Sequence, residues 1–473
     1  MALNYSNYLA YREALKNGET TAVNEVKTFL AEIESQKHLN AFLETFDQSA
    51  LAMAQQVDEK IKNGTAGKLA GMVIGLKDNL CYKDHSVSVS SKILSNFKSL
   101  FSATAVQRLL DEDAIIIGRL NCDEFAMGSS NEKSAYGPVL NPIDNTRVPG
   151  GSSGGSAVAV AANLCHASLG TDTGGSVRQP ASFTGTVGLK PTYGRISRWG
   201  LIAYGSSLDQ IGPFTKSVQD SALLLEVMAG EDEHDTTASH EKVEEYTQGS
   251  VSGKKKIAVL RDALESEGLS PAVKARFTEV IEKLKAQGHQ VDVVDFNLLN
   301  QMVPTYYVIS NAEASSNLSR FDGIHYGYRS QEAKDIESTY VKSRSEGFGS
   351  EVKRRIMMGT FVLSTGYYDA YFAKAQKVRR LIQDKTKAIF ENYDLVLTPT
   401  TPHGAFKLGH NSDNPVAMYL EDIFTVHANL AGNPAISLPM GTNEKGMPFG
   451  IQLMAPFFKE KQMFAFSEEM MKL

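Results

Sequence analysis

The chain has 473 residues, of which 42% are hydrophobic and 22% are charged, and its formal net charge is −6. This composition is typical of a globular protein and excludes disordered and fibrous chains, and the chain is long enough to bury a core that needs no metal ion or disulfide. The weak negative balance argues against a broad basic face that grips nucleic acid, although it leaves room for a local basic patch or an RNA-binding partner.

The three cysteines, Cys81, Cys122 and Cys165, are odd in number and widely spaced. Such spacing predicts neither a disulfide framework nor a zinc site, and it suits a reducing compartment. The N-terminal segment lacks a basic region followed by an apolar core, so we interpret it as neither a signal nor a transit peptide. No apolar run approaches the ~18 residues that span a bilayer. We therefore expect a cytoplasmic protein with no membrane association.

The N-terminal third of the sequence predicts helices and then short buried strands. We expect residues 1–65 to form a helical segment. The apolar run 71–76 is typical of a strand, and this strand would deliver Lys77 at its C-terminal end. A second apolar run, 114–117, predicts another strand. Residues 141–156 are rich in Pro, Gly and Ser, and a run of small apolar residues follows them directly.

The C-terminal part predicts a β-α-β unit. Residues 256–260 form an apolar strand, a helix capped by Ser270 begins at Pro271 and ends at Gly288, and the next strand follows at 291–294. Alternation of this kind predicts an α/β fold in which a large sheet is covered by helices on both faces. We expect one domain over 1–473, with a helical part (1–65), a core (66–220) and the rest of the sheet (221–473). Further predicted elements are a helix at 367–393, strands at 394–399 and 450–454, a final helix at 458–473, and an exposed polar excursion at 231–254.

Two Gly/Ser-rich clusters, GGSSGGS at 150–156 and TDTGGS at 171–176, stand close together. A flexible linker does not explain them, because core-type apolar sequence lies between them. A phosphate-binding loop would need GxxxxGK[ST], which neither cluster contains. Reading Asp172-Thr173-Gly174 as half of an aspartic protease site fails because the chain has no second D[ST]G motif to share the proton.

Nucleophilic catalysis by a serine explains both clusters better. Such a serine needs a base that takes its proton and backbone N–H groups that stabilise the oxyanion, and a glycine-rich turn such as 173–176 can aim several amides at one point. None of the ten histidines lies in an HExxH or GxSxG pattern. Lysine is the natural substitute if burial lowers its pKa from ~10.4. Lys77 is the best candidate, although a strand-end lysine alone is more often a solvated surface residue.

The stretches GLKDN (75–79), GGSSGGSA (150–157) and GTDTGGSVRQPA (170–181) together resemble the amidase signature family. The resemblance implies an α/β/α fold with a large mixed sheet and a Ser–cis-Ser–Lys triad. In that triad Ser176 is the nucleophile, Ser152 is the bridging serine after a cis Gly151–Ser152 peptide, and Lys77 is the base. It further implies that the oxyanion is met by the amides of Thr173, Gly174 and Gly175.

Four stretches outside the signature, at 187–213, 304–327, 351–356 and 419–439, are similar to those of one group within this family, the A subunits of glutamyl-tRNA(Gln) amidotransferases. This similarity implies a glutaminase that releases ammonia from glutamine. A partner, the B subunit, would use ATP and magnesium to amidate Glu-tRNA(Gln), a small C subunit would tether the two, and tRNA would be bound mainly by the partner. No cofactor or metal is implied in this chain, and use of Asp-tRNA(Asn) stays open.

The same similarity implies a pocket for the head group of glutamine. Arg355 would bind the α-carboxylate, since a guanidinium offers a bidentate fork, Asp422 would bind the α-ammonium, and Tyr306 would line the pocket. Arg354 and Tyr307 remain alternatives, because a shift of one residue would exchange them for Arg355 and Tyr306. Without the resemblance, 351–356 reads as a basic, solvated helix face. Gly128 and Ser129 would border the site.

Two other interpretations stay open at this stage. A free-standing amidase acting on another small amide would share the triad but lack the Arg355 and Asp422 pair. A catalytically silent scaffold is disfavoured because all three triad residues are present. A thiol nucleophile at Cys81 is weaker still, since no histidine lies near it in a recognisable pattern.

Overall fold

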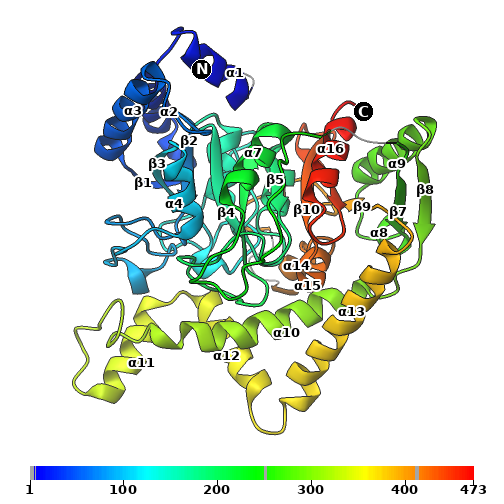
Figure 1. Ribbon diagram of the computed structural model, residues 1–473. Helices are drawn as coiled ribbons and strands as arrows, with labels where there is room; N and C mark the ends of the chain where they lie inside the picture. The colour runs from blue at the N-terminus through cyan, green and yellow to red at the C-terminus, as the bar shows by residue number, and fades with distance from the viewer. Residues whose placement is uncertain (1–4, 6, 250–252, 411–414) are drawn as a thin grey trace.

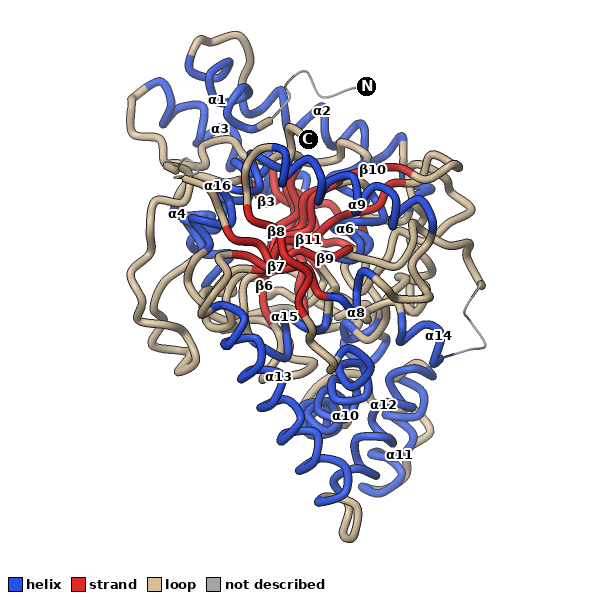
Figure 2. The backbone as a smooth tube through the Cα atoms, turned by 90° about the vertical axis from the view of Figure 1, so that its right-hand side faces the viewer, coloured by secondary structure: helices blue, strands red, loops and turns tan. Residues whose placement is uncertain are grey.

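The computed structural model describes residue 5 and residues 7–249, 253–410 and 415–473. An eleven-stranded mixed sheet runs through the described part of the chain, in the order β1-β3-β2-β4-β6-β5-β10-β11-β9-β7-β8 (Figures 1 and 2). The strands are β1 (Phe42–Thr45), β2 (Val73–Lys77), β3 (Ile115–Leu120), β4 (Ala167–Asp172), β5 (Val187–Lys190), β6 (Gln210–Thr215), β7 (Lys256–Leu260), β8 (Gln290–Val294), β9 (Leu395–Pro399), β10 (Ala435–Thr442) and β11 (Pro448–Met454).

Helices cover both faces of this sheet, as the sequence predicts. Side chains of β2 alternate between the faces, so that Ile74 and Leu76 enter one core while Val73 enters the other. The first core includes residues of α1 (Tyr8–Lys16), α4 (Thr104–Asp111), α7 (Val218–Met228), α9 (Pro271–Ala286) and α16 (Glu460–Met470). The second includes residues of α2 (Ala22–Ser35), α3 (Asp47–Lys62), α5 (Gly154–Ala161) and α6 (Arg178–Thr184).

A further group of helices projects beyond one end of the sheet (Figures 1 and 2). The longer ones are α10 (Leu299–Asn317), α11 (Ile336–Gly347), α12 (Ser350–Leu363) and α13 (Lys374–Phe390). Of the short helices, α8 (Arg261–Leu264) follows β7, and α14 (Pro415–Leu420) and α15 (Val426–Ala431) lie between β9 and β10. Short 3-10 turns lie at Lys37–Leu39, Lys92–Leu94, Glu124–Ala126 and Leu318–Arg320. Helices α10 and α12 pack so closely that a Cβ added to Gly359 would lie 1.9 Å from the carbonyl oxygen of Asn311.

Several predicted elements are confirmed. Lys77 ends β2, and α9 begins at Pro271 with the Ser270 hydroxyl accepting from the Val273 amide. Two predictions were wrong. The first 65 residues also contain β1, which pairs antiparallel with β3 and extends the sheet by one edge strand. The helix expected at 367–393 is regular only from Lys374, after a π-helical stretch at Asp369–Ala373.

The polar excursion at 231–254 contains no helix or strand among its described residues, while 250–252 lie outside them. Across the described ranges, no helix combines the length and the hydropathy needed to cross a membrane.

Candidate active site

The fold brings the two Gly/Ser-rich clusters to the end of β2. Strands β2 and β4 are parallel neighbours, so their C-terminal ends lie at the same edge of the sheet. Lys77 is the last residue of β2, and the turn 173–176 follows β4 directly. The other cluster leads into α5, which packs against β4. Residues that are about 100 positions apart in the sequence therefore meet at one point.

Lys77 is fully buried and surrounded by hydroxyl groups. Its Nζ donates to Ser152 Oγ at 2.7 Å, to Ser153 Oγ at 2.9 Å and to Thr171 Oγ1 at 2.9 Å. Burial lowers the pKa of Lys77 to about 8, and more distant carboxylates offset only part of that effect. No carboxylate of the described chain lies within ion-pair distance of Nζ, so no close counter-charge cancels the effect of burial. With a pKa of about 8, about a tenth of Lys77 is neutral at pH 7.

The peptide bond between Gly151 and Ser152 is cis, as the resemblance implies. The Gly151 amide donates to Gln179 Oε1 at 3.0 Å, and the Gln179 side-chain amide donates to the Ser129 carbonyl at 2.8 Å. A Cβ added to Gly151 would lie 2.2 Å from Asp123 Oδ2, so no larger residue fits there. Sequence reasoning missed Gln179, which lies within the GTDTGGSVRQPA stretch that carried the resemblance.

Ser176 lies beside the Lys77–Ser152 pair and is 9% exposed. Its carbonyl oxygen accepts from the Ser153 amide at 3.3 Å, which joins the two clusters. Its hydroxyl takes part in none of the hydrogen bonds found between described residues. The structure thus joins Lys77 to Ser152 directly, but the Ser152–Ser176 hydrogen bond that the triad implies is not formed in this state. Catalytic hydrogen bonds often tighten only when substrate binds.

The turn between β4 and α6 carries the predicted oxyanion donors. The amides of Thr173, Gly174 and Ser176 make no hydrogen bond within the described chain, which leaves them available to a ligand. The structure differs from the prediction at Gly175, whose amide donates to Asp172 Oδ1 at 2.9 Å. Gly175 has a φ of +133°, which residues with a side chain rarely adopt, so a glycine is required to shape the turn.

A buried ion pair that the sequence analysis did not identify fixes this turn. Arg178 Nε and Nη2 donate to the two carboxylate oxygens of Asp172, each at 3.0 Å. Burial raises the pKa of Asp172, but Arg178, Asn429 and Lys190 together lower it by more, to about 2. The same guanidinium donates to the Thr425 carbonyl, to Gln452 Oε1 and to Asn429 Oδ1, at 2.8, 2.9 and 2.7 Å.

Arg355 is the buried arginine of α12. It is 3% exposed, whereas the side chain of Arg354 is 45% exposed, so the alternative assignment to Arg354 faces solvent. Arg355 Nε donates to Glu351 Oε1 at 2.8 Å and Nη1 donates to Tyr204 Oη at 2.8 Å. Its guanidinium lies over the rings of Tyr204, Tyr307 and Tyr419, between 5.2 and 5.7 Å from their centroids.

Tyr306 and Asp422 lie next to the turn that carries Ser176. The ring of Tyr306 packs on Gly174, where an added Cβ would lie 2.5 Å from Cζ. Asp422 is 5% exposed, and Ser129 Oγ donates to its Oδ2 at 2.7 Å. Burial raises the pKa of Asp422 to about 8 despite that hydrogen bond. Tyr306 therefore borders the reaction centre, while Tyr307 covers Arg355.

Comparison with known proteins identifies the family. A family model described as Amidase matches residues 24–464. The chain belongs to the amidase family. It is 48% identical to the A subunit of the glutamyl-tRNA(Gln) amidotransferase of Chlorobaculum tepidum over 100% of this chain and 98% of that protein. It is 51% identical to the protein of the same name from Lachnospira eligens over 94% and 93% of the two chains.

Solved structures show the same fold. The crystal structure of the glutamyl-tRNA(Gln) amidotransferase A subunit from Thermotoga maritima matches with a TM-score of 0.77 and 41% identity over 94% of this chain and 90% of that one. Peptide amidase from Stenotrophomonas maltophilia matches with a TM-score of 0.82 but 27% identity, over 99% and 97%. The amidase fold is thus shared by proteins with different substrates, and the pocket residues have to distinguish among them.

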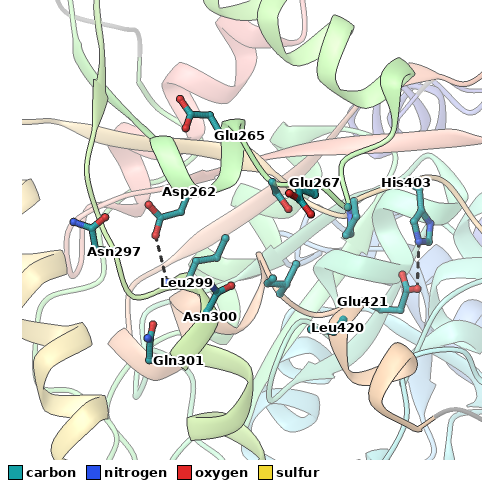
Figure 3. A pocket seen from close by; sticks show the side chains of 14 residues that line it. Asp262, Glu265, Glu267, Asn297, Leu299, Asn300, Gln301, His403, Leu420 and Glu421 are labelled. Atoms are coloured by element: carbon teal, nitrogen blue, oxygen red, sulfur yellow. Dashed lines mark hydrogen bonds and ion pairs between the residues drawn. The ribbon is translucent and has the colours of Figure 1, made fainter.

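This amidase has a separate cavity of about 780 Å³, lined in part by the chain neighbours of Asp422 (Figure 3). Leu420, Glu421 and Ile423 line it, and His403 Nε2 lies 3.3 Å from Glu421 Oε1. Burial lowers the pKa of His403, but Glu421 and the Gly404 carbonyl together raise it by more, so the pKa lies above its usual value. None of the triad residues lines this cavity, so it is not the reaction site. Its acidic lining is completed by Asp262, Glu265 and Glu267.

Replacing Asp172 by asparagine is expected to destabilise the amidase strongly. The change leaves the Arg178 guanidinium buried without its counter-charge, which typically lowers the free energy of unfolding by about 3–5 kcal/mol. Asp144→Asn is the matched control, because the Asp144 carboxylate that pairs with Arg147 is solvent-exposed, and its loss should destabilise the protein much less. Urea unfolding of both variants measures the difference, and equal losses would contradict a special role for the buried pair.

Proposed function

We propose that this amidase is the glutaminase component of a tRNA-dependent amidotransferase, and that it hydrolyses glutamine to glutamate and ammonia. The observation that carries the proposal is a buried cation and a buried anion, Arg355 and Asp422, both close to Tyr306, whose ring packs on Gly174 beside Ser176. An α-amino acid head group needs one cation and one anion held in this way. A free-standing amidase that acts on a simple amide has no use for the pair, and similar proteins from three organisms are named as amidotransferase A subunits.

In the proposed mechanism, Ser176 Oγ attacks the side-chain amide carbon of glutamine. Its proton passes through the Ser152 hydroxyl to neutral Lys77, which returns it to the nitrogen that leaves as ammonia. The amides of Thr173 and Gly174 donate to the oxyanion, and the adjacent Ser176 amide adds a third donor. Water then hydrolyses the glutamyl ester, so that glutamate leaves and the Ser176 hydroxyl is restored.

The described contacts support the substrate orientation. Arg355 uses Nε and Nη1 for Glu351 and Tyr204, and Nη2 makes no hydrogen bond within the described chain, so it is available to the α-carboxylate. Asp422 uses Oδ2 for Ser129, which leaves Oδ1 for the α-ammonium. A cation bound there would lower the raised pKa of Asp422 and keep the carboxylate ionised.

The proposal includes partners. The B and C subunits of the amidotransferase would receive the ammonia, with ATP and magnesium held by the B subunit, which would also provide most of the binding surface for Glu-tRNA(Gln). The glutaminase step itself needs no metal or cofactor in this chain, because the triad supplies both base and nucleophile. A cytoplasmic location and a single domain over 1–473 belong to the same proposal.

Ammonia release from glutamine tests the substrate assignment. Arg355→Lys should raise the KM for glutamine by about 10–100-fold, because an ammonium cannot keep the planar contacts to Glu351 and Tyr204 and also present a donor to the carboxylate. Arg354→Lys, which changes the exposed neighbour, should leave the KM unchanged. Release by the wild type should also rise when the B and C subunits, ATP and Glu-tRNA(Gln) are added. Rapid release from simple amides, indifferent to both substitutions and to the partners, would instead indicate a free-standing amidase.

The pH dependence tests the base. We expect kcat/KM for glutamine to rise about tenfold per pH unit and to level off above about pH 8, since only neutral Lys77 accepts a proton. Asp422 also titrates near pH 8 and would act in the same direction, so the profile of Asp422→Asn serves as the control. That variant should bind glutamine weakly but keep the inflection. A profile that loses its inflection in Asp422→Asn would rule out Lys77 as its source.

A further inference from the structure

The helical hairpin of α12 and α13 exposes a dense group of apolar side chains. Met357, Phe361, Tyr367, Tyr368 and Tyr371 are between 43% and 66% exposed, and we call this group the hairpin patch. No charged residue occurs from position 356 to position 368. The hairpin projects away from the sheet in both views (Figures 1 and 2). Contiguous exposed apolar surface of this kind marks interaction sites in soluble proteins.

The rings of the hairpin patch support one another. The ring centroids of Phe361 and Tyr367 lie 4.4 Å apart, those of Phe361 and Tyr371 5.7 Å, and those of Tyr367 and Tyr371 6.1 Å. Aromatic side chains that are already ordered lose little conformational freedom on binding. The patch is therefore preformed, and a partner can bury it without first arranging it.

Charges at the edge of the patch identify the chemistry of the partner. One exposed acidic residue, Asp369, lies between Tyr368 and Tyr371. Two exposed lysines, Lys374 and Lys377, follow at the start of α13 and give this edge a net positive charge, and neither forms an ion pair within the described chain. We propose that the hairpin patch docks a partner protein that presents an apolar centre with an acidic rim. This inference rests on the proposed function, which requires a partner protein.

Other occupants fit the surface less well. In a two-fold dimer through this face, the lysines of the two copies would approach each other. A nucleic acid needs cations across its contact surface, whereas positions 356–368 carry no charge and the next residue is the acidic Asp369. A protein interface instead combines an aromatic and methionine-rich centre with a polar rim.

The position of the patch connects it to the proposed glutamine pocket. Arg355 lies on α12, two residues before Met357, and Tyr306 lies on α10, which packs on α12 at Gly359. A partner bound to the hairpin patch would therefore contact the helix that holds the carboxylate-binding arginine.

The triple variant Met357→Ser, Phe361→Ser, Tyr367→Ser tests the proposal. Calorimetric titration with the purified B and C subunits from the same genome should show a Kd at least about 100-fold weaker than for the wild type. Glutaminase activity of the chain alone should not change, which also shows that the variant is folded. The matched control replaces three exposed apolar residues elsewhere, Leu100, Ile143 and Val293, by serine and should bind as the wild type does.

A charge variant tests the acidic rim independently. Lys374→Glu combined with Lys377→Glu should slow association, and the deficit should shrink as salt is added, because rim charges act mainly on the association rate. Stopped-flow mixing with the B and C subunits measures this rate, and an unchanged rate would overturn the acidic rim.

The outcomes separate this proposal from the proposed function. If the wild type binds the B and C subunits and the triple variant binds equally well, the docking site is wrong while the function stands. If the wild type does not bind them at all, the proposed partners are wrong, and the docking proposal with them. Two other results would also overturn the proposal. One is self-association of the wild type in light scattering, and the other is its binding to phosphatidylglycerol vesicles, in either case if the triple variant loses that behaviour and the control variant keeps it.

Discussion

The buried ion pair between Asp172 and Arg178 is the constraint on which the reaction centre depends. Each carboxylate oxygen of Asp172 accepts from the guanidinium and from a backbone amide of the turn, Gly175 on Oδ1 and Val177 on Oδ2. Ser176 lies between those two amides, so its position is fixed by bonds on both sides. The guanidinium also binds α15 and β11, through Thr425, Asn429 and Gln452, and thereby ties the turn to the far half of the sheet.

Comparison of two buried lysines shows that geometry, more than pKa, singles out the proposed base. Burial also lowers the pKa of Lys190 well below its usual range. Its Nζ, however, donates to the Pro191 carbonyl and to Gln210 Oε1, and within the described chain it bonds to no serine hydroxyl. Lys77 instead contacts the hydroxyl of Ser152, which follows a cis peptide bond. A low pKa allows a lysine to act as a base, and only its neighbours decide what it can deprotonate.

Much of the site was predictable because its signals are local. The strand ending at Lys77, the two Gly/Ser-rich clusters and the cis Gly151–Ser152 bond all follow from short sequence stretches and the family resemblance, and the structure confirms these elements. The surroundings of Arg355 were not predictable in this way. Glu351 is a neighbour one turn earlier on the same helix, but Tyr204 and Tyr419 come from distant parts of the sequence that only the folded chain brings together.

The missed features share that physical cause. Strand β1 is a four-residue edge strand that is defined by its pairing with β3 rather than by an apolar pattern of its own. The amide of Gly175 looked available in a glycine-rich turn, but the Asp172 carboxylate accepts from it. A sequence identifies which groups can bond, and the fold decides which of them already have partners.

Trapping the covalent intermediate tests the central claim most directly. The amidase is mixed with glutamine, quenched in acid within milliseconds, digested and analysed by mass spectrometry. The account predicts a glutamyl adduct on the peptide that contains Ser176, absent in Ser176→Ala and retained in Cys81→Ser. An adduct on any other residue, or glutamine hydrolysis by Ser176→Ala at the wild-type rate, would contradict it.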